Sequence, residues 1–206
     1  MRSLTDVVVQ SCIALTFILV VQGVIFPHNK FLFDQMSLLS SFDSSRQYEA
    51  VTKLSEYKFE NCGNVSDEKF IVTNLVFVPD PLVFPGTFNV SFDAELKIDV
   101  PDNLTAVVQM SKRVNRQDVP IPCEGNVGSC VYGNLCTILK GVECPQEFVT
   151  AQVPCNCPFK AGTYSLPVAS FKVNTVFLPP GVYAITVSLT HNDIDLGCYK
   201  LVATFA

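Results

Sequence analysis

Residues 88–100 read FNVSFDAELKIDV, and this stretch decides the fold class. Apolar side chains occupy every even-numbered position from Phe88 to Val100, and polar side chains occupy the odd-numbered positions between them. A period of two sustained over this length predicts a β-strand with one buried side and one solvent-facing side. The length of the run also predicts a bend or bulge within the strand.

Shorter segments before and after this one carry the same kind of pattern. Alternating or β-rich runs, separated by Pro and Gly clusters, occur at 70–78, 104–110, 171–177, 183–189 and 199–205. The intervening segment 121–162 is rich in Cys and turn residues, and a single short helix fits 131–140. Another short helix at 47–57 is left open. These features predict an all-β domain of two antiparallel sheets, either a sandwich or an open cup.

The composition suits one packed globular domain and excludes several functions. The chain has 206 residues, of which 49% are hydrophobic and 16% charged, and it is too apolar for intrinsic disorder. Its net charge of -5 argues against a nucleic-acid partner, which requires a basic surface. Two His residues leave little material for a metal site or for His-based catalysis. We therefore expect no metal ion and no cofactor.

The N-terminus has the layout of a secretory signal peptide. Arg2 precedes an apolar run over 7–21, and Gly23 supplies a small residue at a plausible cleavage point. The run is short for a membrane span, which needs roughly 20 residues, and an uncleaved anchor is the alternative. We expect residues 1–23 to be removed, residues 24–58 to form a propeptide or flexible extension, and residues 59–206 to form the exported domain.

The nine Cys residues fit an exported chain once the signal peptide is set aside. Cys12 lies within it, and the other eight lie between Cys62 and Cys198. An even number of Cys in an exported chain predicts disulfides, with free thiols or zinc as the alternatives. Cys155 and Cys157 do not have the spacing of zinc ligands, and no His lies near them. We therefore expect a framework of four disulfides.

Three glycosylation sequons support the same export route. They begin at Asn64, Asn89 and Asn103, and each predicts an Asn that faces solvent and carries a glycan. Asn89 falls on the polar side of the 88–100 strand, as a glycan requires.

The sequence contains no recognisable catalytic motif, neither a nucleophile elbow nor a zinc-protease motif. His191 precedes Asn192-Asp193 in a predicted hairpin turn, where a solvated histidine is expected rather than a catalytic base. A pair of carboxylates acting as a glycosidase has no spacing signature, but the chain has no Trp to stack on a sugar ring. We therefore expect no enzymatic activity.

The 16 Phe residues raise a question that periodicity does not answer. They fit a filled core, and they equally fit a dry cavity between two splayed sheets. Such a cavity suits acyl chains, because burying each CH₂ is worth about 0.8 kcal/mol. Parity alone does not show which apolar stripe faces a cavity. Our candidate lipid-contacting residues from these stripes are Phe88, Val90, Phe92, Tyr183 and Ile185.

Residues 154–167, PCNCPFKAGTYSLP, resemble the signature stretch of the lysosomal ganglioside activators within the ML lipid-recognition family. The resemblance covers about 59–206. Weaker matching segments follow in the same order along the chain: Pro79-Asp80-Pro81, Pro85-Gly86, Ile121-Pro122-Cys123, Gly128-Ser129-Cys130, Gly181-Val182-Tyr183 and Leu196-Gly197-Cys198.

This resemblance implies a β-cup of two sheets around a lipid cavity, and one disulfide pairing out of the 105 that eight Cys permit. The implied pairs are Cys62–Cys198, Cys123–Cys130, Cys136–Cys157 and Cys144–Cys155. The implied function is non-enzymatic. The protein would touch a membrane transiently, extract a glycosphingolipid or another lipid, and present it to a soluble lysosomal glycosidase such as β-hexosaminidase. The alternative is a secreted, extracellular lipid carrier or a lipid-sensing partner of a receptor.

The chain departs from these activators just before Gly181. The activators carry a Trp-containing loop there, which is thought to touch membrane and substrate, whereas this chain has the shorter Leu178-Pro179-Pro180. Phe84 is a candidate apolar contact in its place, with a plain turn residue as the alternative. The lipid that the protein prefers is therefore left open.

Overall fold

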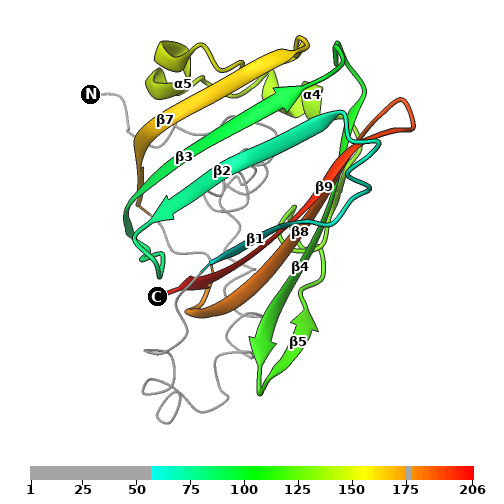
Figure 1. Cartoon of the computed structure of the whole chain (residues 1–206). Helices are drawn as coiled ribbons and strands as arrows, with labels where there is room; N and C mark the ends of the chain where they lie inside the picture. Colours follow the sequence, from blue (N-terminus) through cyan, green and yellow to red (C-terminus); the bar gives the residue numbers. More distant parts are fainter. Residues whose placement is uncertain (1–56, 175–177) are drawn as a thin grey trace.

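The computed structural model describes residues 57–174 and 178–206. They form two antiparallel sheets that face each other, as the alternating pattern predicts (Figure 1). No helix in this part of the chain is long and apolar enough to cross a membrane. The strands are β1 (Lys58–Asn61), β2 (Phe70–Val78), β3 (Gly86–Leu96), β4 (Leu104–Val114), β5 (Gln117–Pro120), β6 (Val131–Tyr132), β7 (Gly162–Val173), β8 (Gly181–His191) and β9 (Ile194–Phe205).

The larger sheet has the order β1-β9-β8-β4-β5, and β6 also pairs with β4. The smaller sheet has the order β2-β3-β7. The two sheets lie closest at the turn between β8 and β9, which we call the narrow end. They diverge toward the turn between β4 and β5, which we call the wide end (Figure 1).

The strand predicted over 88–100 is present, but it ends earlier than predicted. β3 stops at Leu96, because neither neighbour continues: Leu96 pairs with Phe70 at the start of β2 and with Gly162 at the start of β7. Val100 is buried, as its parity predicts, but it forms an isolated bridge with Phe159 instead. The predicted irregularity is confirmed, since the β3–β7 register shifts between Val90 and Phe92.

The long strands β3, β4 and β8 turn their apolar side chains toward the facing sheet. On β3 the even-numbered residues from Phe88 to Leu96 are buried, and on β8 the odd-numbered residues from Tyr183 to His191 are buried. On β4 the same holds for the even-numbered residues from Leu104 to Met110. The apolar interior therefore lies between the two sheets, and the predicted faces of these three strands are confirmed. The run predicted over 171–177 is the end of β7 up to Val173, and its residues 175–177 lie outside the described residues.

One side of the interior is closed by contacts between β2 and β9, which belong to different sheets. The Tyr199 hydroxyl on β9 donates a hydrogen bond to the Phe70 carbonyl (2.9 Å) and accepts one from the Val72 amide (2.9 Å). At the wide end, the Leu82 amide donates to the Thr204 carbonyl (2.9 Å). The outer edge of β2 is thus joined to the other sheet instead of facing solvent.

The other side of the interior is covered by the Cys-rich segment, which contains two short helices, α4 (Leu135–Leu139) and α5 (Gln146–Ala151). The helix predicted over 131–140 is wrong in its first half, because Val131 and Tyr132 pair with β4, and Asn134 caps a helix that begins only at Leu135. Helix α5 was not predicted. Its buried residue Phe148 packs against Phe171, with ring centroids 6.1 Å apart.

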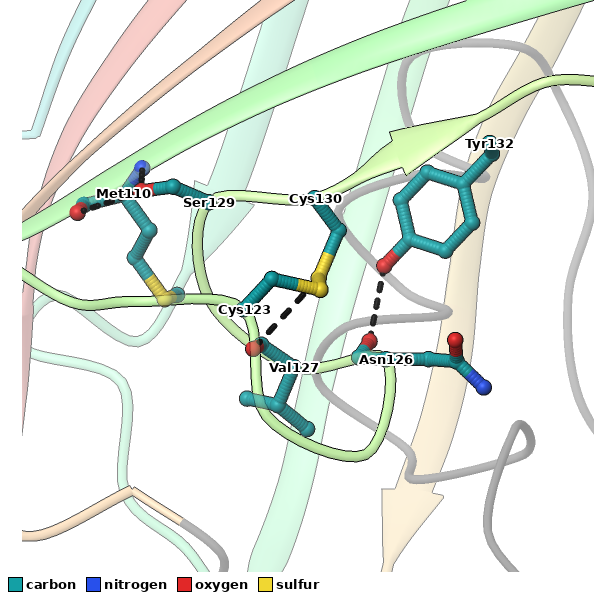
Figure 2. The surroundings of a disulfide bond; sticks show 7 residues. All are labelled: Met110, Cys123, Asn126, Val127, Ser129, Cys130 and Tyr132. Carbon is teal, nitrogen blue, oxygen red and sulfur yellow. Dashed lines mark hydrogen bonds between the residues drawn. A yellow bond between two sulfur atoms is a disulfide. The ribbon is translucent and has the colours of Figure 1, made fainter.

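The loop closed by the Cys123–Cys130 disulfide joins the Cys-rich segment to β4 at Met110 (Figure 2). The Ser129 hydroxyl accepts a hydrogen bond from the Met110 amide (3.0 Å), and the Tyr132 hydroxyl donates one to the Asn126 carbonyl (2.8 Å). Gly128 has a φ of +96°, and a Cβ at this position would overlap the Pro122 carbonyl. Only glycine therefore permits this close turn.

The disulfides are those that the family resemblance implies. Cys62 pairs with Cys198, Cys123 with Cys130, Cys136 with Cys157, and Cys144 with Cys155. The first joins the chain just after β1 to β9, across a sequence separation of 136 residues. The other three hold the Cys-rich segment together.

The β8–β9 hairpin corrects one prediction. Asn192 and Asp193 form its turn, both with positive φ, as a tight hairpin requires. His191, however, is not a solvated turn residue. It is the last inward-facing residue of β8 and is 7% exposed, because it continues the buried parity of that strand. Its Nδ1 atom has no hydrogen-bond partner among residues 57–174 and 178–206.

Candidate functional site

An apolar hollow lies inside the narrow end, between the two sheets and the Cys-rich segment. Its volume is about 470 Å³, including the part that opens to solvent. Both sheets contribute to it at the ends of β3 and β8 and at the beginnings of β2, β4 and β9. The lining residues are Phe70, Phe92, Ala94, Leu96, Val100, Leu104, Val153, Pro154, Phe159, Tyr164, Leu189 and Leu196.

The chemistry of this lining favours hydrocarbon over a polar ligand. Tyr164 supplies the only side-chain polar group among the lining residues, and its hydroxyl already donates to the Lys160 carbonyl. Small-molecule sites likewise combine mostly apolar walls with few polar groups. The hollow can therefore bind an apolar chain, but it has no groups suited to catalysis.

The six predicted lipid-contacting residues lie along the interior, but only Phe92 lines the hollow. Val90 and Ile185 are buried further toward the wide end, each at most 2% exposed. Phe88 and Tyr183 lie at the wide end and are also buried. Phe84 is only partly buried and packs against this core.

The residues at the wide end form an aromatic cluster around Phe205. Its ring centroid lies 5.5 Å from that of Phe84 and 5.3 Å from that of Tyr183. Phe84 also packs edge-on against Phe88, at 5.9 Å. The Tyr183 hydroxyl donates to the Pro179 carbonyl (2.6 Å), which fixes the segment just before β8 against the cluster. Burial raises the pKa of Tyr183, so this hydroxyl stays protonated and keeps donating.

Most lining residues of the hollow were not predicted as site residues. Leu104, Leu189 and Leu196 lie on buried strand faces, but the sequence gives no sign that they border a space instead of filling one. Phe159 lies within the 154–167 stretch, and its amide and carbonyl pair with those of Val100. The family resemblance therefore pointed to the segment that contains Phe159, whereas the alternating pattern did not.

The charged groups near the hollow have structural partners. The Asp99 carboxylate accepts hydrogen bonds from the Ala161 amide (2.8 Å) and from the Lys160 ammonium (2.8 Å). These two contacts lower the pKa of Asp99. Its contribution to stability is present above its unfolded pKa and is lost as the pH falls below about 4. The pair joins the segment after β3 to the start of β7, beside the hollow.

The predicted glycosylation sites all have accessible side chains. Asn64 and Asn103 are exposed, near the Cys62–Cys198 disulfide and the β8–β9 hairpin respectively. Asn89 is half-exposed on the outer face of β3, where its side-chain oxygen accepts a hydrogen bond from Ser170 (2.5 Å). Glycans on these residues remain a prediction, and none of them would block the interior.

Within the described residues, no group of three or more His, Cys, Asp or Glu side chains is placed to hold a metal ion.

Filling the hollow provides a direct test of its capacity. Ala94→Phe places a ring among the lining residues, and we expect the affinity for an apolar fluorescent probe to fall about tenfold, a loss of ~1.4 kcal/mol. Thr87→Phe, at an exposed position of the same strand, is the matched control and should leave probe binding unchanged. Equal binding by both variants, measured by fluorescence titration, would contradict the assignment of the hollow as the binding space.

Comparison with known proteins places this architecture in a family. The sequence model of the ML domain matches residues 56–205. The ganglioside GM2 activator of Mus musculus is 33% identical over 163 residues, covering 75% of this chain and 84% of that protein. The ganglioside GM2 activator of Macaca fascicularis is also 33% identical, over 74% of this chain and 84% of that protein.

Among solved structures, a Niemann-Pick type C2 protein from the Japanese carpenter ant is similar with a TM-score of 0.40 and 18% identity. The match covers 72% of this chain and 99% of that one. The family match and the identity to the two activators are sufficient by themselves: this chain belongs to the ML domain family, the lipid-recognition family that its Cys-rich stretch resembles.

Proposed function

We propose that this protein is a non-enzymatic lipid-binding and lipid-transfer protein that extracts a glycosphingolipid from membranes and presents it to a soluble hydrolase. The observation that carries the proposal is the apolar interior between two sheets of an ML domain, with the 470 Å³ hollow at its narrow end. The two relatives described above are named ganglioside GM2 activators, which supports a ganglioside-like lipid as the cargo.

The interior supplies the driving force for taking a lipid out of a bilayer. Acyl chains enter between the sheets, where each buried CH₂ is worth about 0.8 kcal/mol relative to water. The headgroup stays outside, because the lining offers almost no polar partner for a sugar. A hydrolase then reaches a bond that the bilayer surface had shielded.

The six predicted lipid-contacting residues take different places in this proposal. Phe92, at the hollow, contacts the end of a chain. Val90, Ile185, Phe88 and Tyr183 line the path from the wide end. Phe84, partly buried in the β2–β3 loop, lies at the entrance and takes the contact that Trp makes in the family's activators.

The processing and destination of the chain also belong to the proposal. Residues 1–23 act as a signal peptide, residues 24–58 as a propeptide or extension, and residues 59–206 as the lipid-binding domain. The mature protein resides in the lysosomal lumen or in the extracellular space, with β-hexosaminidase as the expected hydrolase. The signal peptide and the extension up to residue 56 lie outside the described residues.

The test combines purified protein, a vesicle-bound glycosphingolipid and a β-hexosaminidase. We expect turnover only when the protein and the hydrolase are both present. Turnover by this protein alone would replace the proposal with an enzyme that uses an unrecognised acid pair. No stimulation of the hydrolase, despite binding of the lipid, would favour the secreted carrier. Imaging of the tagged full chain then separates lysosomal from extracellular destinations.

Acid pH should strengthen binding to anionic vesicles. Residues 1–23 contain one base and one acid, Arg2 and Asp6, so the remaining chain keeps the net charge of -5. As the pH falls toward about 4.5, carboxylates with ordinary pKa values gain protons, and repulsion from an anionic surface decreases. The pKa values of Asp93, Asp99 and Asp118 are lowered by hydrogen bonds, so other carboxylates account for most of this change.

We expect binding to be at least about threefold tighter at about pH 4.5 than at about pH 7.4, measured by co-sedimentation with anionic vesicles. Neutral vesicles serve as the control and should show a smaller change. Equal binding to anionic vesicles at both pH values would count against this electrostatic account.

A further inference from the structure

Lys112 occupies an unusual position at the wide end of the interior. It lies on β4 with the same parity as the buried residues Leu104 to Met110, so it points to the interior side of the larger sheet. β4 ends two residues later, at Val114, and Lys112 pairs across the sheet with Tyr183 near the start of β8. Lys112 therefore continues the row of buried apolar residues on β4 at the edge of the wide end, which we call the rim.

Lys112 lies beside an aromatic ring and forms no ion pair within the described residues. The side chain is half-buried, and its ammonium lies 5.7 Å from the centre of the Tyr183 ring, a cation–π distance. The ion pairs among residues 57–174 and 178–206 are Arg113 with Asp118 and Lys160 with Asp99, and neither involves Lys112. The Tyr183 hydroxyl is already engaged with Pro179.

The backbone beside Lys112 is shaped to admit its side chain. Gly181 has a φ of +150°, and a Cβ there would meet the Lys112 Cε atom at 2.7 Å and the Nζ atom at 3.5 Å. A larger residue at 181 would therefore displace the end of the lysine. The glycine therefore leaves room for the lysine side chain beside the Tyr183 ring.

We propose that Lys112 is a headgroup-binding residue that pairs with the acidic group of a lipid whose chains occupy the interior. This inference rests on the proposed function and deepens it, since it names the class of headgroup: one that carries a carboxylate or a phosphate. Partial removal of a lysine from water is unfavourable unless a negative group is supplied, and here no side chain of the described residues supplies one. Burial accordingly lowers the pKa of Lys112.

Geometry also explains why the partner is a lipid headgroup and not a free anion. The ammonium lies at the level where the interior stripe ends, so a lipid with its chains between the sheets places its first polar groups beside it. Lysine presents three donors on a flexible stem, which suits a single carboxylate or phosphate oxygen without demanding a fixed orientation.

The experiment measures extraction from vesicles as a ratio of two lipids with the same chains. In one arm, the full chain is offered a sialylated glycosphingolipid and its desialylated counterpart. In the other, it is offered phosphatidylglycerol and phosphatidylcholine. We expect the wild-type protein to prefer the acidic member in at least one arm, and Lys112→Met to lower that preference by about fivefold.

Two further variants separate the proposal from a general charge effect. Lys172→Met removes an exposed, outward-facing lysine on β7 and should leave the preference unchanged. Lys112→Arg keeps the charge and should retain most of the preference. A folding defect lowers extraction of both lipids together, so it does not mimic the expected change in ratio.

The outcomes are distinguishable. A preference in the first arm assigns the sugar carboxylate, and one in the second assigns the phosphate. Extraction without any preference for an acidic lipid, or an equal loss in Lys112→Met and Lys172→Met, overturns the role of Lys112 while leaving the proposed function standing. Failure of the wild-type protein to extract any of the four lipids contradicts the proposed function itself.

Discussion

Replacing Cys62 and Cys198 together by Ser is expected to lower the free energy of unfolding by about 5 kcal/mol, the largest effect that we predict for a change outside the interior. This disulfide closes a loop with a sequence separation of 136 residues. In the chain-entropy description, a longer loop removes more freedom from the unfolded chain and so stabilises the folded one more. The Cys62 amide also donates to the Cys198 carbonyl (2.9 Å), so the disulfide holds β1 in place beside β9.

The Cys123–Cys130 pair provides a matched control within the same chain. Its sequence separation is 7 residues, and the same description predicts a loss of only about 2.5 kcal/mol when both of its Cys residues are replaced by Ser. Urea denaturation at fixed pH, with the remaining disulfides verified, measures both values. Equal losses for the two pairs would show that loop length does not govern the stabilisation.

Tyr199→Phe is expected to lower the free energy of unfolding by about 2–4 kcal/mol, although it removes a single oxygen atom. The Tyr199 hydroxyl serves both the Val72 amide and the Phe70 carbonyl, and without it two buried polar groups lose their partner. Each such group costs roughly 1–3 kcal/mol. Because the hydroxyl links β9 to β2, the variant also weakens the joint between the two sheets.

Tyr164→Phe is the matched control, since the Tyr164 hydroxyl donates to the Lys160 carbonyl near the surface, and its loss should cost under about 1 kcal/mol. Burial raises the pKa of Tyr199 to about 12. The contribution of the Tyr199 hydroxyl to stability is therefore complete below the pKa of about 10 that it has in the unfolded chain, and it is lost as the pH rises toward 12. A loss below 1 kcal/mol for Tyr199→Phe at neutral pH would mean that the two backbone groups find other partners.

The alternating pattern was sufficient to predict the buried faces of the strands, but it was insufficient to predict the hollow between the sheets. The even-numbered residues of 88–100 are all on the buried side except at Ile98, which lies after β3 has ended and is only half-buried. The same parity that predicts Phe92 and Leu189 as interior residues does not reveal that both border the hollow. Whether facing side chains fill a gap or surround one depends on the distance between sheets, which no single strand encodes.

The features that local sequence patterns did not predict correctly share a physical cause. Each depends on contacts with residues that are distant in the sequence. Helix α5 is too short for periodicity to reveal, and its one buried residue, Phe148, packs against Phe92 and Phe171 on the smaller sheet. His191 is buried because the β8 ladder continues to its pairing with Leu104, whereas the local sequence indicates a turn. The disulfide pairs came from the family resemblance, since eight Cys permit many pairings.

In the function that we propose, the interior between the sheets receives the acyl chains of a lipid. The most direct measurement incubates the purified protein with vesicles that contain a radiolabelled glycosphingolipid, removes the vesicles by sedimentation, and counts the lipid that elutes with the protein on gel filtration. We expect a soluble protein–lipid complex, formed less well by Ala94→Phe than by Thr87→Phe. Absence of any co-eluting lipid, for glycolipids and phospholipids alike, would contradict it.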